Sequence, residues 1–158
     1  MGLALGAGLM LGACGFTPAY GPDGAARDLL GRVEVDPPGS REEFDLVARL
    51  EERLGRPQAA QYRLSFRVEI AEEGQAISQT NETNRYQVIG AVSYTLRDRE
   101  TGRDLSSGRV RGFTAYSATG TAVASVASRR DARARLMRLL ADRIVTRLIA
   151  TAPEWNRP

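Results

Sequence analysis

The chain has 158 residues, and its 42% hydrophobic and 26% charged residues are ordinary for one globular domain with a single core. It contains no histidine, and Cys14 is its only cysteine. These counts exclude the usual zinc sites, the Ser-His and Cys-His catalytic pairs and an internal disulfide bond. They leave carboxylate-only catalysis open, so the composition disfavours an enzyme without excluding one.

The basic residues are all arginine, 22 in number, and the net charge is +3. Guanidinium groups bind phosphate and carboxylate through a planar fork of donors, which makes an anionic partner one explanation. A genome whose composition favours Arg, Ala and Gly codons explains the same bias equally well. Because a charge of +3 does not indicate a nucleic-acid binder, no nucleic acid is expected as a partner.

The first segment, residues 2–13, carries no charged side chain. It is shorter than the ~20 apolar residues that span a bilayer, and it has the length of a signal-peptide hydrophobic region. It ends in Leu11-Gly12-Ala13-Cys14, which resembles the bacterial lipobox. We therefore expect Cys14 to be lipidated and to become the first residue of the mature protein. The alternative is a core cysteine on a buried apolar helix.

Two further expectations come from this segment. A signal peptide normally opens with Lys or Arg, whereas the first charged residue here is Asp23, so we expect the true start to lie upstream of Met1. Acyl chains on Cys14 would anchor the protein, since each buried CH₂ contributes about 0.8 kcal/mol. In the sorting rule known for many Gram-negative lipoproteins, Gly15 after the cysteine implies the outer membrane, facing the periplasm.

The next elements are a tether, a strand and a helix. Residues 15–31 are rich in Gly and Pro and show no period, which is typical of an extended tether. Residues 32–35 alternate and predict a short strand. Ser40 and Glu43 form a capping box that begins a helix ending near residue 55. Its apolar positions are Phe44, Val47, Leu50 and Leu54.

The clearest strand covers residues 62–70, with five apolar side chains on one face and four polar ones on the other. Such alternation predicts a sheet that is covered on one side only. Residues 71–83 are polar and predict a long hairpin connection, with possible strand extensions around Ile77.

A third strand follows over residues 86–96, and residues 97–103 form a charged turn in which Gly102 can adopt a positive φ. The fourth strand runs from about 105 to 116. Its glycines, Gly108 and Gly112, indicate bulges or a close approach of another backbone.

A long helix is predicted over residues 121–150, ending at Pro153. Its apolar stripe is Val123, Ala127, Ala134, Met137, Ala141, Ile144 and Leu148. The element order is β-α-β-β-β-α, and the fold class is α+β: a two-layer sandwich with two helices packed on one face of a four-stranded sheet. The predicted core is Phe44, Val47, Leu50, Leu64, Phe66, Val68, Tyr86, Val88, Val92, Met137, Ile144 and Leu148.

The predicted domain plan has four parts. Residues 1–13 form a lipoprotein signal peptide and residues 14–31 a lipid-anchored tether. Residues 32–152 form a single α+β domain, and residues 153–158 a C-terminal tail.

The run at the lipidation site is Leu11-Gly12-Ala13-Cys14-Gly15-Phe16-Thr17-Pro18-Ala19-Tyr20-Gly21. Together with the element order, the long hairpin before Arg85 and the closing helix, it resembles the lipopolysaccharide-assembly lipoprotein E family in its alphaproteobacterial form. The resemblance covers the whole chain, and this run is its sharpest motif.

The resemblance implies a non-enzymatic outer-membrane lipoprotein without cofactor or metal. It implies that the protein lies in the lumen of the lipopolysaccharide-assembly β-barrel protein D, which it plugs and helps to assemble. It also implies contact with lipopolysaccharide on its way to the outer leaflet. The family's proposed contacts are basic residues near the long hairpin and near the start of the last helix, so the candidates here are Arg85, Arg129, Arg130 and Arg133. For each of them, a solvated surface arginine is the plainer interpretation.

Two other function classes stay open at this point. One is an auxiliary lipoprotein of a lipid-transport ABC system that binds an anionic lipid. The other is an enzyme that uses the carboxylates of Glu42, Glu43, Glu51 and Glu52. Those residues lie on the exposed face of a short helix, where salt bridges to neighbouring arginines explain them.

Overall fold

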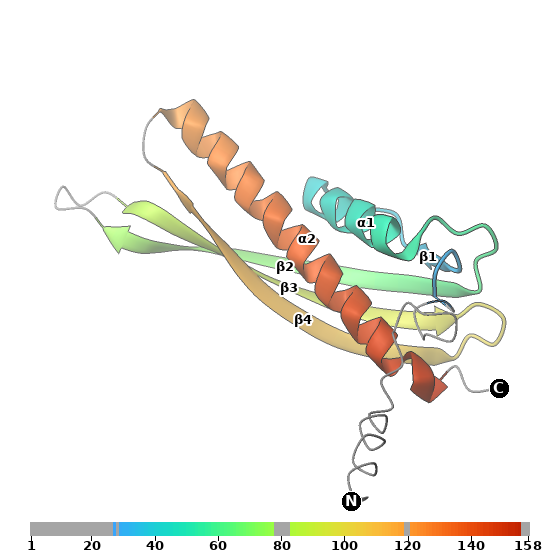
Figure 1. Ribbon diagram of the computed structural model, residues 1–158. Helices are drawn as coiled ribbons and strands as arrows, with labels where there is room; N and C mark the ends of the chain where they lie inside the picture. The colour runs from blue at the N-terminus through green and yellow to red at the C-terminus, as the bar shows by residue number, and fades with distance from the viewer. Residues whose placement is uncertain (1–26, 28, 78–82, 119–120, 156–158) are drawn as a thin grey trace, which may run out of the picture.

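The computed structural model describes residues 27, 29–77, 83–118 and 121–155 (Figure 1). The predicted signal peptide and Cys14 lie outside these residues. The elements are β1 (Val33–Val35), α1 (Arg41–Leu54), β2 (Tyr62–Ile77), β3 (Thr83–Asp98), β4 (Asp104–Ser117) and α2 (Ala122–Trp155). This order and the α+β class confirm the sequence prediction. Among the described residues, no helix combines the length and apolar character needed to cross a membrane.

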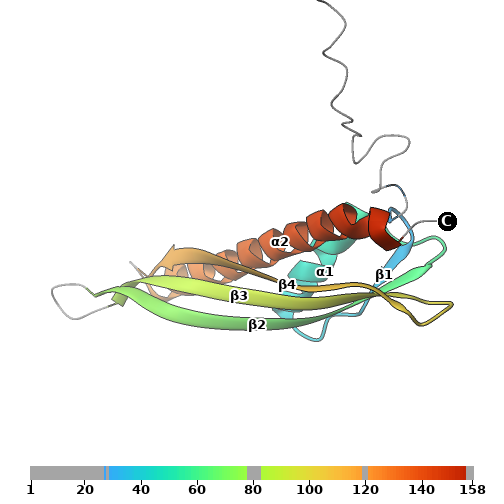
Figure 2. The ribbon, with the colours of Figure 1, turned by 90° about the horizontal axis from the view of Figure 1, so that it is seen from below.

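The sheet has the strand order β1-β2-β3-β4, with both helices on one of its faces (Figures 1 and 2). β1 is parallel to β2, and α1 provides the crossover that a parallel pair requires. The other pairs are antiparallel and long, since 16 residues of β2 extend about 50 Å. β2 continues to Ile77, so residues 71–77 are strand rather than hairpin connection. The prediction had allowed for strand extensions around Ile77.

α1 begins at the predicted residue because its first amides are capped. The backbone N–H of Glu43 donates to Ser40 Oγ at 3.2 Å, and the Glu43 carboxylate accepts from the amide of Gly39 at 2.6 Å. The placement of Phe44 in the core is wrong, because its side chain is 63% exposed. At 3.6 residues per turn, Phe44 lies roughly 100° from the centre of the buried stripe. That stripe is Leu46, Val47, Leu50 and Leu54.

α2 supplies the other half of the core. Its buried residues are Ala132, Leu136, Met137, Leu140, Ala141, Ile144, Val145, Leu148 and Ala152. Val123 and Ala127 were expected in this stripe but are exposed, Val123 by 80%, because the buried stripe begins only at Ala132. α2 also passes through Pro153 and ends at Trp155. A proline so near the end removes a single helical hydrogen bond, and the Trp155 ring packs edge-on against Tyr62 at 5.6 Å.

Glycines let α2 lie directly against the sheet. A Cβ at Gly90 would stand 2.9 Å from Leu136 Cδ2, and one at Gly112 would stand 2.5 Å from Leu139 Cδ2. A Cβ at Gly108 would instead stand 3.0 Å from the hydroxyl of Tyr94. The neighbours of Gly108 and Gly112 are side chains rather than another backbone, so the close approach is that of leucine side chains of α2 to the strand at Gly112. No bulge occurs at Gly108 or Gly112, through which the pairing with β3 is regular.

The predicted sheet residues divide into two groups. Leu64, Val88 and Val92 are fully buried, while Phe66 and the other inner-face residues beyond it are only partly buried. β1 ends opposite Leu64, so the following part of β2 has no strand beside it within the described chain. The side chains there are open toward that side, which explains their lower burial. The partly buried residues of β2 in question are Phe66 and Val68. Tyr86 is also partly buried, but it lies on β3, opposite Gly74, and stacks on Tyr116.

Candidate functional site

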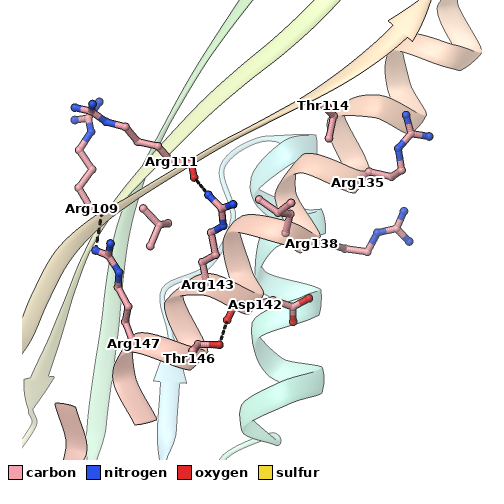
Figure 3. A pocket seen from close by; sticks show the side chains of 11 residues that line it. Arg109, Arg111, Thr114, Arg135, Arg138, Asp142, Arg143, Thr146 and Arg147 are labelled. Carbon is pink, nitrogen blue, oxygen red and sulfur yellow. Dashed lines mark hydrogen bonds between the residues drawn. The ribbon is translucent and has the colours of Figure 1, made fainter. Parts of the chain in front are cut away.

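An arginine-lined groove of about 1000 Å³ runs between β4 and the middle of α2 (Figure 3). Six of its lining residues are arginines, and Asp142 is its one acidic residue. Val110 and Leu139 contribute an apolar surface between the charged groups. The remaining lining residues are Arg109, Arg111, Thr114, Arg135, Arg138, Arg143, Thr146 and Arg147.

The helical repeat and the strand edge together position these arginines. Positions 135, 139, 143 and 147 recur every four residues and so lie along one side of α2. β4 is an edge strand, and alternate carbonyls along it point away from β3. Three α2 arginines donate to such carbonyls: Arg147 to Arg109 at 2.9 Å, Arg143 to Arg111, and Arg135 to Ala115 at 3.2 Å. Figure 3 shows Arg143 and Arg147 reaching toward β4, while Arg138 extends to the other side of α2.

The positive charge of the arginines that line the groove is balanced there by only one acidic side chain, that of Asp142. Asp142 is already bound by Arg49 at 3.0 Å and Arg53 at 2.7 Å, both on α1, and its hydrogen bonds raise the pKa of Arg49. The side chains of Arg111 and Arg138 point away from the space between β4 and α2: Arg111 lies on the outer face of the sheet, where its charge acts on Glu69, and Arg138 lies on the other side of α2. The arginines that remain in the groove outnumber its one carboxylate and lie beside an apolar strip, so the groove suits an anionic amphiphile.

A second cluster joins the first half of α2 to the rest of the fold, and Glu72 is its centre. The Glu72 carboxylate accepts from Arg129 Nε at 3.0 Å, from Arg133 Nη2 at 3.0 Å and from the Tyr116 hydroxyl. Arg133 also donates to Glu42 of α1 at 2.9 Å. Burial opposes ionisation of Glu72, but the hydrogen bonds from Tyr116 and Arg133 outweigh it and lower its pKa.

The same cluster contains the three α2 arginines expected to contact a ligand. Arg129, Arg130 and Arg133 do lie together, around a small cavity of about 230 Å³. Arg129 and Arg133 are committed to acidic partners of the chain itself, whereas Arg130 is exposed and its side chain has no partner among the described residues. Arg85 lies apart from them, because its neighbour Tyr86 faces the helices and Arg85 faces the opposite side of the sheet.

Sequence reasoning missed the groove, although part of its signal was present. The spacing of Arg135, Arg143 and Arg147 indicated one side of a helix, and Arg109 and Arg111 alternate on a strand. Nothing in the sequence indicated that these two elements lie against each other. For metals, no group of three potential ligands occurs among the described residues.

The fold is shared with bacterial lipoproteins of solved structure. A Caulobacter crescentus CB15 protein described as a lipoprotein is 22% identical, with 84% of this chain and 98% of that chain covered and a TM-score of 0.69. Rare lipoprotein B of Shewanella oneidensis is 14% identical, with 80% and 98% covered and a TM-score of 0.61. Lipoprotein B of Nitrosomonas europaea is 12% identical, with 78% and 85% covered and a TM-score of 0.58. None of the curated proteins gives a significant match.

The family model for lipopolysaccharide assembly, LptE, matches residues 30–148. The chain therefore belongs to the LptE lipopolysaccharide-assembly family, which confirms the resemblance found in the sequence. Membership assigns the protein a role in lipopolysaccharide assembly and does not favour the ABC-system alternative. The family consists of non-catalytic assembly lipoproteins, and the lack of catalytic activity in this chain stays a prediction.

Proposed function

We propose that the protein is an outer-membrane lipoprotein, anchored through Cys14, that works in the lumen of the lipopolysaccharide-assembly β-barrel protein D. It plugs this barrel, assists its assembly and contacts lipopolysaccharide during delivery to the outer leaflet. Family membership and the lipobox support the proposal. The exposed sheet face supports it too, because it carries polar and charged residues that suit the polar interior of a barrel.

The observation that carries the ligand part of the proposal is the arginine-lined groove between β4 and α2. Lipopolysaccharide carries phosphates, acidic sugars and acyl chains, and the groove offers free arginine donors beside Val110 and Leu139. We assign the strongest contacts to Arg143 and Arg147, which reach across the groove toward β4 and form hydrogen bonds only with backbone carbonyls of the described chain. Arg130 and Arg85 stay proposed contacts on other surfaces. Arg129 and Arg133 can reach a ligand only by sharing donors that now bind Glu72 and Glu42.

Replacing Arg143 and Arg147 together by Gln is expected to weaken binding of purified lipopolysaccharide about tenfold and to reduce its salt dependence. Two guanidinium groups that contact phosphate would be lost, while the fold keeps all its internal ion pairs. Binding is measured by titration at several salt concentrations, with the melting temperature as a check on folding.

The matched control removes the same charge elsewhere, by replacing Arg56 and Arg103, which are exposed outside the groove. Equal losses of affinity for lipopolysaccharide in both double variants would show that net charge, rather than the groove, governs binding. Unchanged lipopolysaccharide binding with lost co-purification of the barrel would assign the groove to the partner protein and overturn the ligand assignment.

Cys14→Ser is expected to release the protein from the membrane fraction and to remove the mass of the acyl chains. Without lipid, no described helix of the chain can anchor it by spanning a bilayer. Fractionation and intact-mass measurement of the wild type and the variant test this. Identical fractionation and unchanged lipid mass would contradict the anchor.

A further inference from the structure

The groove between β4 and α2 is built from two repeats of nearly equal length. Four residues of an α-helix rise about 6 Å, and two residues of a strand extend about 7 Å, so each fourth residue of α2 meets each second residue of β4. At three steps an arginine of α2 donates to a carbonyl of β4, in the pairs Arg147–Arg109, Arg143–Arg111 and Arg135–Ala115. The remaining step carries Leu139, whose side chain lies against Gly112.

The two ends of the groove differ in how their charge is compensated. At the end nearer the start of α2, Arg135 forms an ion pair with Asp131. At the other end, Arg143 and Arg147 donate only to backbone carbonyls and form no ion pair with the described part of the chain. Asp142 does not balance them, because two arginines of α1 already bind it.

The other arginines that line the groove add little to this charge. Arg109 donates to both carboxylate oxygens of Glu69, at 3.1 and 2.6 Å, and Arg111 acts on the same carboxylate from the outer face of the sheet. Arg138 extends to the other side of α2 (Figure 3). The uncompensated positive charge is therefore concentrated at the Arg143 end of the groove.

The edge of β4 at that end offers hydrogen-bond donors. The N–H and C=O of one strand residue point to the same side, so the amides of Arg109 and Arg111 point outward with their carbonyls. The carbonyls already accept from Arg147 and Arg143, which leaves the amides and the remaining guanidinium N–H groups for a ligand. A phosphate has enough oxygens to accept from both guanidinium groups and from an edge amide, whereas a carboxylate has only two.

The step beside these donors is apolar. Leu139 is half-buried, and the carbon stems of the arginines one turn before and after it extend its apolar surface. An acyl chain over Leu139 would remove this surface from water. Beyond it, toward the start of α2, the charge of Arg135 is already balanced by Asp131.

We propose that the groove binds a phosphorylated amphiphile in one orientation, with its phosphate between Arg143 and Arg147 and its acyl chain over Leu139. The chain then runs toward Arg135 and the start of α2. This orientation rests on the proposed function, which gives the groove a role in lipopolysaccharide binding without a direction. It makes phosphate, rather than a sugar carboxylate, the anion that the site recognises.

The test uses three probes: purified lipopolysaccharide that is intact, dephosphorylated or deacylated. Each is titrated against the full-length chain in detergent solution. For the wild type, each treatment of the probe is expected to raise the Kd about tenfold or more. For R143Q/R147Q, the Kd for the intact probe is already raised and dephosphorylation raises it no further, while deacylation still does. Such coupling identifies the ligand group that the two arginines contact.

Two further substitutions test the direction. Leu139→Gln is expected to remove the dependence on acyl chains and to keep the dependence on phosphate, while Leu139→Met keeps both and shows that the fold tolerates a change at this position. Arg135→Gln removes the same charge and the same kind of carbonyl contact as Arg143→Gln. It is expected to leave the ratio of the Kd values for dephosphorylated and intact probe unchanged, whereas Arg143→Gln lowers this ratio.

Amide hydrogen exchange locates the phosphate without a substitution. The amide of Arg111 is expected to gain protection with the intact and deacylated probes and not with the dephosphorylated one. Phosphate dependence that survives in R143Q/R147Q, or that falls equally in Arg135→Gln and Arg143→Gln, overturns the orientation and leaves lipopolysaccharide binding standing. A wild type that binds none of the probes overturns the orientation together with the ligand part of the proposed function.

Discussion

Replacing Leu140 by alanine is expected to lower the free energy of unfolding by about 3–5 kcal/mol. The side chain is fully buried, and its Cδ atoms face Gly90 of β3 and Gly112 of β4. Glycine has no side chain that could move into the space left by the leucine, so the cavity stays open. Equilibrium unfolding in urea, with the slope unchanged, measures the loss.

Phe44→Ala provides the control, because both substitutions remove a large apolar side chain from a helix. Phe44 is exposed, so its loss is expected to change stability by about 0.5 kcal/mol or less. Comparable losses of unfolding free energy in the two variants would contradict the assignment. Either the buried face of α1 or the packing of α2 over Gly90 and Gly112 would then be wrong.

Glu72→Gln is expected to cost about 2 kcal/mol at neutral pH, because it removes the charged acceptor shared by Arg129, Arg133 and Tyr116. The Glu72 side chain is only 18% exposed, so water replaces these partners poorly. Thermal or urea unfolding at pH 7 measures the loss. The control is Glu73→Gln, one residue away, which removes an exposed carboxylate without a partner in the described chain and is expected to be nearly neutral.

The pH dependence of stability tests the same cluster independently. The folded-state pKa of Glu72 is lowered from 4.5, so the unfolded chain binds the proton more readily. The stabilisation is therefore complete above pH 4.5 and is lost as the pH falls through the lower folded-state pKa. Wild type is expected to lose stability in acid more steeply than Glu72→Gln. Parallel curves for the two proteins would contradict the assigned role.

Local patterns in the sequence predicted the elements well. The Ser40–Glu43 cap began α1 at the predicted residue, and the alternation over 62–70 defined the central strand. The errors arose where packing decides between similar patterns. Phe44 has apolar neighbours at helical spacing, but Leu46 is closer to the centre of the stripe. Val123 continues the periodicity of α2 past the point where the core ends.

The candidate site depended on contacts that no local pattern contains. Glu72 and Arg129 are 57 residues apart, and the sequence placed Glu72 in a polar connection rather than on the helix-facing side of a strand. Three arginines within two turns of α2 suggested a cluster for anions. The structure gives two of them acidic partners and places other arginines of α2, Arg143 and Arg147, in the groove where β4 and α2 meet.

The arginines that bind the outward carbonyls of β4 come from α2, which is synthesised after all four strands, and this has a consequence for biogenesis. Until α2 docks, both long edges of the sheet are unprotected and the apolar surface around Gly90 and Gly112 is uncovered. A chain that ends before residue 122 would be a set of long hairpins with the characteristics of an aggregation template. Truncated products of this protein are therefore expected to self-associate, besides lacking function. Completion of α2 is the step that covers the β4 edge and the apolar surface around the glycines.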